Sequence, residues 1–457
     1  MAQPLAIVVL AMRFATVTVA FLLLFSVLLP LASKAQQGPE KWVTAWAASA
    51  QGPYPVGNVI LQPDLHRVFP SPETGARDQS FRLIVGPDIW GREARIRLSN
   101  AFGTKPITFD GVFAGLQLGS SALVAGTNTP VTFGGSPSVT VEPGASAWSD
   151  TVTLPFAATA NLRDLQGRKL AISFHIAGES GPMTWHAKGL TTSYITAPGT
   201  GSHGAEEDEA AFPYGTTSWY FLDAVDMKVP GQTQLIVALG DSLTDGTGST
   251  LNGDDRWPDV LSRRLHAKFG NRFAVVNAGI GGNLITGPAD FSPQMPYPGG
   301  PAALQRLERD VLSLSGVSAV IWFEGINDFS KNGNVSAEAA ANALREGVGI
   351  IRKRHPGVRV IGATVTTALG NAGPAHGFAE QDIKRQALND FIRGSGVFDG
   401  VIDFDKTIAN PDTGEMQPEF VPDSTTGGPG DKLHPNRLGY LAMGQAIDLT
   451  LFGPPPS

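Results

Sequence analysis

One serine of the chain lies where a nucleophile is useful. Leu235–Leu239 is an uninterrupted apolar run, which is typical of a strand buried on both faces, and the run stops at Gly240. Ser242 therefore lies at the carboxyl end of a predicted strand, the edge where open parallel sheets bind their ligands. Ser242 is a candidate nucleophile. The alternative is a simple turn, because glycine, aspartate and serine are common turn residues.

A serine hydroxyl needs a base to remove its proton, and the base needs a partner that holds it. Of the eight histidines, His434 has an aspartate three residues before it, Asp431, and a Pro-Asn continuation after it. Asp431 can bond one ring nitrogen while the other faces Ser242, since such triads are defined by geometry and not by sequence distance. Asp403 and Asp405 are the next candidates for orienting His434. The alternative is that Asp431 and His434 only cap the final helix.

Two further segments complete a pattern. Asn277–Asn283 and Gly325–Asp328 each directly follow an apolar run, so each is expected at a strand end. Together with the segments around Ser242 and His434, they resemble the motifs of the GDSL, or SGNH, hydrolase family. The resemblance extends over residues 232–452.

The resemblance implies a three-layer, flavodoxin-like α/β/α fold and a carboxylic ester hydrolase. It implies Ser242 as nucleophile, His434 as base and Asp431 as the residue that orients the base. It also implies Gly282 and Asn327 as oxyanion donors, and the Ser242 N–H is expected to supply a third bond. Turn formation is the alternative role for Gly282 and Asn327.

Two aspartates beside these motifs, Asp241 and Asp328, are expected to hold the loops and to take no part in the chemistry. The sequence contains no His-Glu-x-x-His segment or other convincing metal cluster, so no cofactor and no metal are predicted. No pairing of two carboxylates resembles a glycosidase site.

The composition describes a folded chain with more than one domain. At 457 residues, two domains are expected, and 42% hydrophobic against 16% charged residues excludes a disordered protein. The net charge is −7 and there is no basic run, so nucleic acid is excluded as a partner. We predict an all-β sandwich or jelly-roll domain over 36–230, the hydrolase domain over 231–452 and a short tail at 453–457.

The β prediction rests on a period of two. Ala94–Ser99 and Leu170–Ile176 alternate apolar and polar residues, as half-buried antiparallel strands do, and Gly and Pro interrupt the region often. Residues 95–103 also resemble a segment of N-terminal domains in exported SGNH hydrolases. His175, His186 and the tryptophans are expected to have structural roles, with an approach of either histidine to the cleft and sugar stacking as the alternatives.

The hydrolase region alternates strand and helix patterns after a linker at 226–234. Pro356-Gly357 ends one of the helices, and Ser336 is its expected N-cap. The expected helices are Trp257–Phe269, Ser336–Arg354, Glu380–Ile392 and Asn436–Leu449, and further strands are expected at Val358–Val365 and Val401–Phe404.

The N-terminus has the features of an export signal. Arg13 precedes the mostly apolar run Phe14–Leu31, and the small residues of Ser33-Lys34-Ala35 fit signal-peptidase cleavage after Ala35. Residues 1–35 are therefore a predicted signal peptide, and the protein is predicted to be secreted or periplasmic. A retained membrane anchor, or a start at Met12, are the alternatives. The chain has no cysteine and so no disulfide framework.

The loops that carry the motifs favour a polar substrate. Thr244–Arg256 and Asp423–Lys432 are rich in Gly, Asn, Asp, Thr and Pro, which suits a shallow polar cleft. We expect short acyl esters, acetyl in particular, on a small-molecule or polysaccharide substrate, and no membrane partner after signal cleavage. Met295–Pro298 is the feature that favours an acyl pocket. The alternatives are a lipase or lysophospholipase, and a non-catalytic polysaccharide-binding protein.

Overall fold

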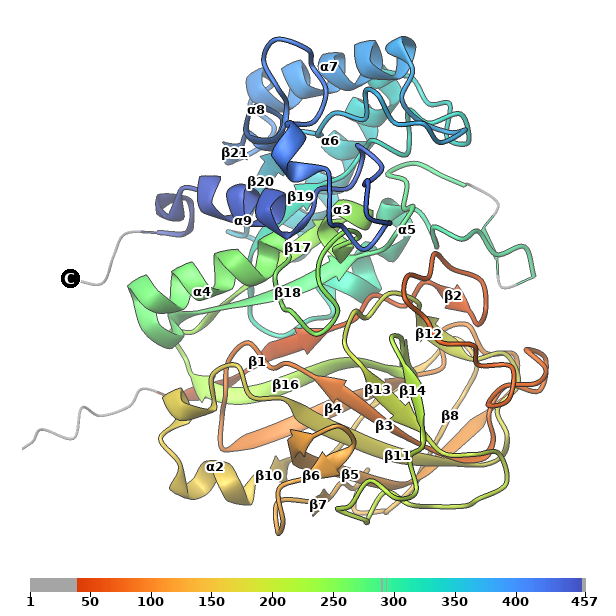
Figure 1. The fold of residues 1–457 in the computed structure, drawn as a ribbon. Helices are drawn as coiled ribbons and strands as arrows, with labels where there is room; N and C mark the ends of the chain where they lie inside the picture. The colour runs from red at the N-terminus through yellow and green to blue at the C-terminus, as the bar shows by residue number, and fades with distance from the viewer. Residues whose placement is uncertain (1–38, 289–290, 293, 454–457) are drawn as a thin grey trace, which may run out of the picture. The chain divides into compact units, whose positions relative to one another are not determined.

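The computed structural model describes residues 39–288, 291–292 and 294–453 (Figure 1). The predicted signal peptide, 1–35, and all of the predicted tail except Gly453 lie outside the described residues. Lys41–Ser457 forms one compact unit, with a strand-rich part followed by alternating strands and helices. Within the described part of the chain, no helix is long and apolar enough to cross a membrane.

The strand-rich part is built from antiparallel strands. One sheet has the order β1-β16-β4-β10, a second β14-β13-β3-β11-β5-β6, and a third β15-β12-β2. The elements are β1 (Glu40–Ala47), β2 (Gly52–Pro53), β3 (Arg77–Val85), β4 (Glu93–Ser99), β5 (Ile107–Gly119), β6 (Ala122–Leu123), β7 (Thr129–Pro130), β8 (Val139–Val141), β9 (Ser146–Trp148), β10 (Val152–Thr153), α2 (Pro155–Thr159), β11 (Leu170–Glu179), β12 (Thr184–His186), β13 (Ser193–Ile195), β14 (Tyr214–Thr216), β15 (Trp219–Tyr220) and β16 (Leu222–Pro230).

Aromatic rings form much of the core of this part. Phe81 on β3 stacks on Phe174 of β11 with centroids 5.2 Å apart, and Phe109 on β5 meets Phe221 edge-on at 5.4 Å. All four side chains are buried, so these rings hold the strands together by burial of apolar area. The strands expected at 94–99 and 170–176 are confirmed as β4 and β11, while the jelly-roll arrangement remains a prediction.

The second part is a five-stranded parallel sheet with the order β18-β17-β19-β20-β21. Numbered along this part of the chain, the order is 2-1-3-4-5, which is the flavodoxin-like doubly wound order. Helices α4 and α9 pack together, and α6 packs with α7 on the other face (Figure 1). The elements are β17 (Gln234–Gly240), α3 (Ser242–Asp245), α4 (Trp257–Phe269), β18 (Phe273–Gly279), α5 (Ala303–Leu307), β19 (Val317–Phe323), α6 (Ala337–Arg354), β20 (Arg359–Ala363), α7 (Ala379–Gly394), β21 (Gly400–Ile402), α8 (Phe404–Ile408) and α9 (Arg437–Ala446).

Most of the predicted helices are confirmed, with local differences. Ser336 caps α6 as expected, because its hydroxyl accepts the Ala339 N–H at 3.1 Å. Phe404, expected at the end of a strand, instead begins α8, because the Asp403 carboxylate accepts the Lys406 N–H and caps a helix there. Only residues 231–233 separate β16 from β17, so the connection is shorter than the predicted linker.

The polar side of β4 differs from its prediction. The alternation predicts a half-buried strand with one exposed side, yet the Arg97 side chain on its polar side is only 5% exposed. Arg97 Nε pairs with Asp223 at 2.6 Å and its Nη1 donates to Ser313 after α5 at 2.8 Å, while Arg95 pairs with Asp226 at 2.8 Å. These ion pairs satisfy the guanidinium groups and allow the strand-rich part to pack on the α/β part.

Candidate active site

The structure brings Ser242, His434 and Asp431 into one chain of hydrogen bonds. Ser242 Oγ lies 2.8 Å from Nε2 of His434, and Nδ1 of His434 lies 2.7 Å from Oδ2 of Asp431. Ser242 begins α3 directly after β17, and the other two residues lie in the loop before α9. The carboxylate is fixed in turn, because its Oδ1 accepts the N–H groups of Leu433 and His434 at 2.9 and 2.8 Å.

Electrostatics set the proton positions in this chain. Burial opposes ionisation of Asp431, but the hydrogen bond and charge of His434 and the two backbone N–H groups lower the pKa of Asp431 to about 2. An ionised carboxylate accepts only, so Nδ1 of His434 donates to it. Nε2 then keeps its lone pair and accepts the Ser242 hydroxyl proton, which is the tautomer that a general base needs.

Close approach of backbones places the serine at the sheet edge. A Cβ on Gly240 would lie 2.3 Å from the Phe323 carbonyl oxygen, and a Cβ on Gly279 would lie 2.3 Å from the Asp245 nitrogen. Glycine at both positions therefore allows α3 to lie directly over the strand ends. Asp241 accepts the N–H of the following turn, from Leu243, at 2.9 Å, so its expected role in holding the loop is confirmed.

The second and third motifs meet beside α3. Gly282 has a φ of 83°, and the side-chain amide of Asn327 donates to the Asn283 carbonyl oxygen at 3.1 Å. Among the described residues, neither the Gly282 N–H nor the Ser242 N–H has a hydrogen-bond partner. The Asn327 amide retains its second hydrogen. These three donors are therefore available to an incoming oxygen atom.

Asp328 holds the same loop from the other side. Its carboxylate accepts the Ile285 N–H at 3.0 Å and the Thr286 hydroxyl at 3.2 Å. Burial raises the pKa of Asp328 to about 6, and the backbone hydrogen bonds oppose that rise. The prediction that Asp328 holds this loop is confirmed.

Arg306 on α5 is a supporting residue that the sequence did not reveal. Its side chain is fully buried and joins three segments, with Nε 2.7 Å from Asn283 Oδ1, Nη1 2.7 Å from the Ala278 carbonyl and Nη2 2.9 Å from the Gly240 carbonyl. A single guanidinium thus ties the ends of β17 and β18 to the loop that carries Gly282. No local pattern marks this arginine.

His376 is a second unpredicted neighbour of the site. Its Nδ1 accepts the Gln381 side-chain N–H at 2.8 Å, and Gln381 also donates to the Ile326 carbonyl beside Asn327. Burial first, and then the charge of His434, lower the pKa of His376 to about 4. His376 is therefore neutral at neutral pH and carries its hydrogen on Nε2.

Other candidates from the sequence lie elsewhere. Asp403 pairs with Arg393 at 2.8 Å, and Asp405 pairs with Arg385 at 2.5 Å. These two carboxylates are therefore engaged by arginines and do not contact His434. His175 is also remote, because it lies between two surface carboxylates of the strand-rich part.

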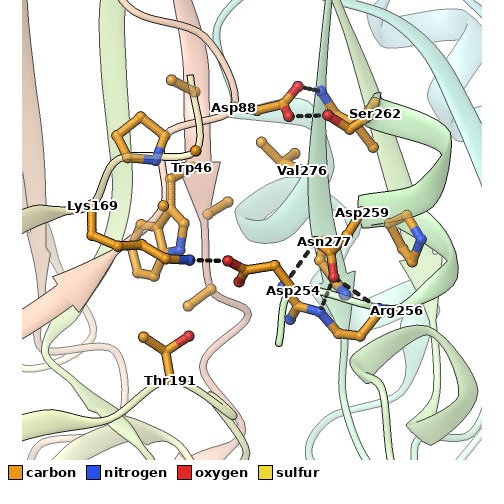
Figure 2. A pocket seen from close by; sticks show the side chains of 18 of the residues that line it. Trp46, Asp88, Lys169, Thr191, Asp254, Arg256, Asp259, Ser262, Val276 and Asn277 are labelled. Atoms are coloured by element: carbon orange, nitrogen blue, oxygen red, sulfur yellow. Dashed lines mark hydrogen bonds and ion pairs between the residues drawn. The ribbon is translucent and has the colours of Figure 1, made fainter. Parts of the chain in front are cut away.

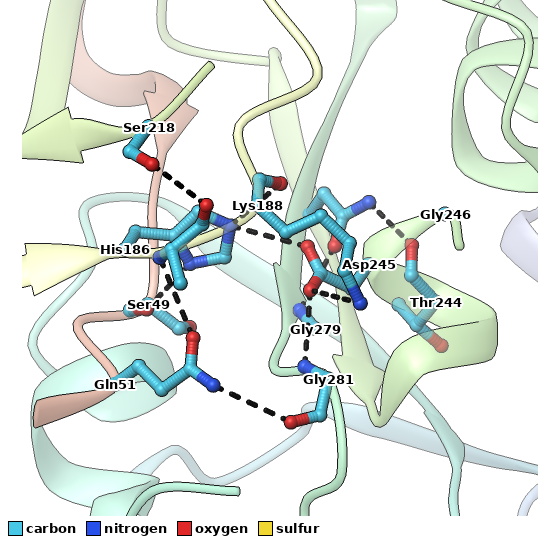
Figure 3. A network of polar contacts seen from close by, with 12 residues as sticks. Ser49, Gln51, His186, Lys188, Ser218, Thr244, Asp245, Gly246, Gly279 and Gly281 are labelled. Carbon is cyan, nitrogen blue, oxygen red and sulfur yellow. Dashed lines mark hydrogen bonds and ion pairs between the residues drawn. The ribbon is translucent and has the colours of Figure 1, made fainter. Parts of the chain in front are cut away.

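The strand-rich part reaches the motif loops. Asn58 Nδ2 donates to the Gly281 carbonyl at 2.8 Å, and the Gln51 amide donates to the Pro298 carbonyl. His186 and Lys188 approach Asp245 of α3 (Figure 3). Sequence patterns indicated His186 only as an alternative and did not indicate the other contacts.

One cavity of the structure lies away from Ser242. It has a volume of about 460 Å³, and neither Ser242 nor His434 lines it (Figure 2). Charged side chains in its wall are paired with one another, as Lys169 with Asp254 at 2.5 Å and Arg256 with Asp259 at 2.7 Å. Within the described residues there is no group of three or more metal-binding side chains.

The match to a family model agrees with the motifs. Residues 238–442 match the model of the GDSL-like Lipase/Acylhydrolase family. A search of curated proteins finds no match. Among solved structures, the chain is similar to a lipase/acylhydrolase from Enterococcus faecalis, with 23% identity over 49% of this chain and 100% of that chain and a TM-score of 0.37. It is also similar to a carbohydrate acetylesterase from Sinorhizobium meliloti, with 16% identity over 47% of this chain and 96% of that chain and a TM-score of 0.35. A third similar structure is an aryl esterase from M. smegmatis, with 17% identity over 47% of this chain and 96% of that chain and a TM-score of 0.36. The chain thus carries a GDSL-like lipase/acylhydrolase domain at residues 238–442.

Proposed function

We propose that the protein is a secreted serine ester hydrolase that works through an acyl-enzyme intermediate. The observation that carries this proposal is the hydrogen-bond chain from Ser242 Oγ through His434 to the ionised Asp431. An acyl-transfer site needs a nucleophile, a base in the correct tautomer and a group that holds the base, and these three residues have those properties.

The geometry supports the following reaction. Ser242 Oγ attacks the ester carbonyl carbon while His434 Nε2 takes the hydroxyl proton, which His434 then gives to the leaving alcohol. A water molecule repeats the sequence on the acyl-enzyme and releases the acid. The negative charge on the carbonyl oxygen is stabilised by the N–H groups of Ser242 and Gly282 and by the Asn327 amide, which have hydrogens available for it.

Replacing Asn327 with alanine is expected to lower kcat by roughly 10²- to 10³-fold and to leave KM nearly unchanged, because an oxyanion donor acts mainly in the transition state. Steady-state kinetics with p-nitrophenyl acetate measures this effect. Asn342→Ala on the exposed side of α6 is the matched control and should retain wild-type kinetics. A change in KM alone would show that Asn327 binds substrate and does not stabilise the oxyanion.

We propose short acyl groups, acetyl in particular, on a carbohydrate as the substrate class. The polar loops 244–256 and 423–432 lie against each other, since the Gly248 N–H donates to Thr425 Oγ1 at 2.9 Å. Gly248 also approaches the backbone of Pro435, next to His434. Polar loops around the base favour a hydrophilic alcohol moiety over a long acyl chain.

A series of p-nitrophenyl esters from two to sixteen carbons tests this assignment. We expect the highest kcat/KM at two to four carbons, with discrimination on the order of 10-fold per misfitted methylene. Met295 favours the lipase alternative, because its side chain is 60% exposed in the loop after the second motif. A maximum at eight carbons or more would contradict the acetyl assignment and favour a lipase or lysophospholipase. Absence of all hydrolysis would favour the polysaccharide-binding alternative.

A further inference from the structure

Within the described residues, the two ring nitrogens of His186, at the end of β12, have only hydrogen-bond acceptors as partners. Its Nδ1 lies 2.7 Å from the Ser49 carbonyl oxygen, and its Nε2 lies 3.1 Å from both Asp245 Oδ1 and the Lys188 carbonyl oxygen (Figure 3). The side chain is 6% exposed. A neutral imidazole has only one N–H, so the second ring nitrogen of a neutral His186 would point its lone pair at the lone pair of an acceptor oxygen in a buried place. The geometry is therefore that of an imidazolium.

The charges around the ring support this protonation state. Burial opposes the charged form, but the charge and hydrogen bond of Asp245, together with the carbonyls of Ser49 and Lys188, raise the pKa of His186 above its usual value. The Lys188 ammonium faces the other oxygen of Asp245 at 3.9 Å, and the Trp219 ring stacks on the imidazole with centroids 5.5 Å apart. Asp245 is thus held between the His186 imidazolium and Lys188, whose own pKa is lowered by burial, with the charge of Asp245 opposing that change.

Asp245 connects these cations to the loop that carries Gly281 and Gly282. Its Oδ2 accepts the Gly281 N–H at 3.0 Å, and Asn58 donates to the Gly281 carbonyl at 2.8 Å. Both polar backbone groups of Gly281 are therefore fixed by residues outside its own loop. The next residue, Gly282, carries the N–H that has no partner within the described residues. The Gly282 N–H belongs to the peptide whose carbonyl Asn58 holds, and Asp245 holds the N–H of the preceding peptide, so both contacts set the direction of that N–H.

We propose that His186, as an imidazolium, is a positioning residue of the active site, and that it fixes the Gly282 N–H through Asp245 and Gly281. This inference rests on the proposed ester hydrolysis. It makes the strand-rich part a component of the active site and gives the enzyme an alkaline limit. When pH rises through the pKa of His186, the deprotonated Nε2 faces Asp245 and the Lys188 carbonyl, and the carboxylate loses the positive charge of the ring.

The test compares His186→Gln with His175→Gln. His175 is also a histidine of the strand-rich part held between two carboxylates, Asp110 at 2.7 Å and Asp78 at 3.0 Å, but it lies away from the site. For His186→Gln we expect kcat about 10²-fold lower, since misplacement near 1 Å has an effect of this order, with KM nearly unchanged. The alkaline fall of kcat should disappear in this variant. His175→Gln should retain both the wild-type kcat and the pH profile.

Asp245→Asn provides a second, independent readout, which remains usable if His186→Gln does not fold. Removing the carboxylate lowers the pKa of His186, so the alkaline fall of kcat should move to lower pH. A wild-type kcat and alkaline limb in His186→Gln would overturn the inference. An unmoved alkaline limb in Asp245→Asn would overturn it as well. Either result, together with an inactive Ser242→Ala enzyme, contradicts this inference alone, whereas an active Ser242→Ala enzyme contradicts the proposed function itself.

Discussion

Replacing Ser242 with alanine will lower kcat toward p-nitrophenyl acetate by at least about 10⁴-fold, because the reaction loses its covalent route. The fold should be retained. Asp241 still caps α3 through its bond to the Leu243 N–H, and alanine has no group that requires a partner. The remaining activity would come from the oxyanion donors and from substrate binding alone.

A matched serine gives the control for this variant. Ser318 lies near the opposite, amino-terminal end of β19, and its hydroxyl donates to the Leu235 carbonyl at 3.0 Å. Ser318→Ala should therefore keep wild-type kcat. Equal unfolding temperatures of Ser242→Ala and the wild-type protein would show that the loss is chemical. Near wild-type hydrolysis by Ser242→Ala would falsify the serine mechanism.

Replacing Asp431 with asparagine is expected to lower kcat by about 10⁴-fold, although the two side chains have the same shape. The reason is that the two carboxylate oxygens of Asp431 have different partners. Oδ1 accepts the N–H groups of Leu433 and His434, so an asparagine keeps its carbonyl oxygen there. Its NH₂ group then occupies the place of Oδ2 and donates to His434 Nδ1. The imidazole is held with its hydrogen on Nε2, where it cannot accept the serine proton.

Kinetics of Asp431→Asn beside Asp403→Asn tests this expectation. Asp403 caps α8, a role that asparagine also performs, so the control should be fully active. The lowered pKa of Asp431 also has a consequence for stability. The ionised carboxylate stabilises the folded state above pH of about 4, and this contribution is lost as pH falls toward the folded-state pKa of about 2. An unchanged rate in Asp431→Asn would mean that another group orients His434.

The α/β part could be predicted from the sequence because its signals are local. The apolar runs before Ser242, Asn277 and Gly325 lie in β17, β18 and β19, and β18 continues beyond its apolar run to Gly279. The prediction that Phe404 ends a strand was wrong because of local capping. Asp403 caps a helix that begins at Phe404, so the apolar run does not continue as a strand. Such a choice between strand and helix is poorly determined over a few residues.

The contacts that support the site could not be predicted, because their partners are far apart in sequence. Lysine is usually found at the protein surface, yet the Lys188 side chain is 2% exposed and approaches Asp245. Asn58 lies in a loop with Gly and Pro, and only the folded chain brings it to Gly281. Arg97 shows the same principle, since an alternating pattern identifies the polar side of a strand but not what covers that side.

Covalent labelling tests the central claim most directly. The wild-type protein is incubated with a p-nitrophenyl phosphonate, whose phosphorus is attacked by an activated serine, and the product is analysed by intact mass and peptide mapping. We predict one phosphonyl group per chain, on Ser242, a loss of esterase activity in proportion to labelling, and no labelling of Ser242→Ala. A label on a different residue, or full esterase activity in a chain labelled at Ser242, would contradict the account.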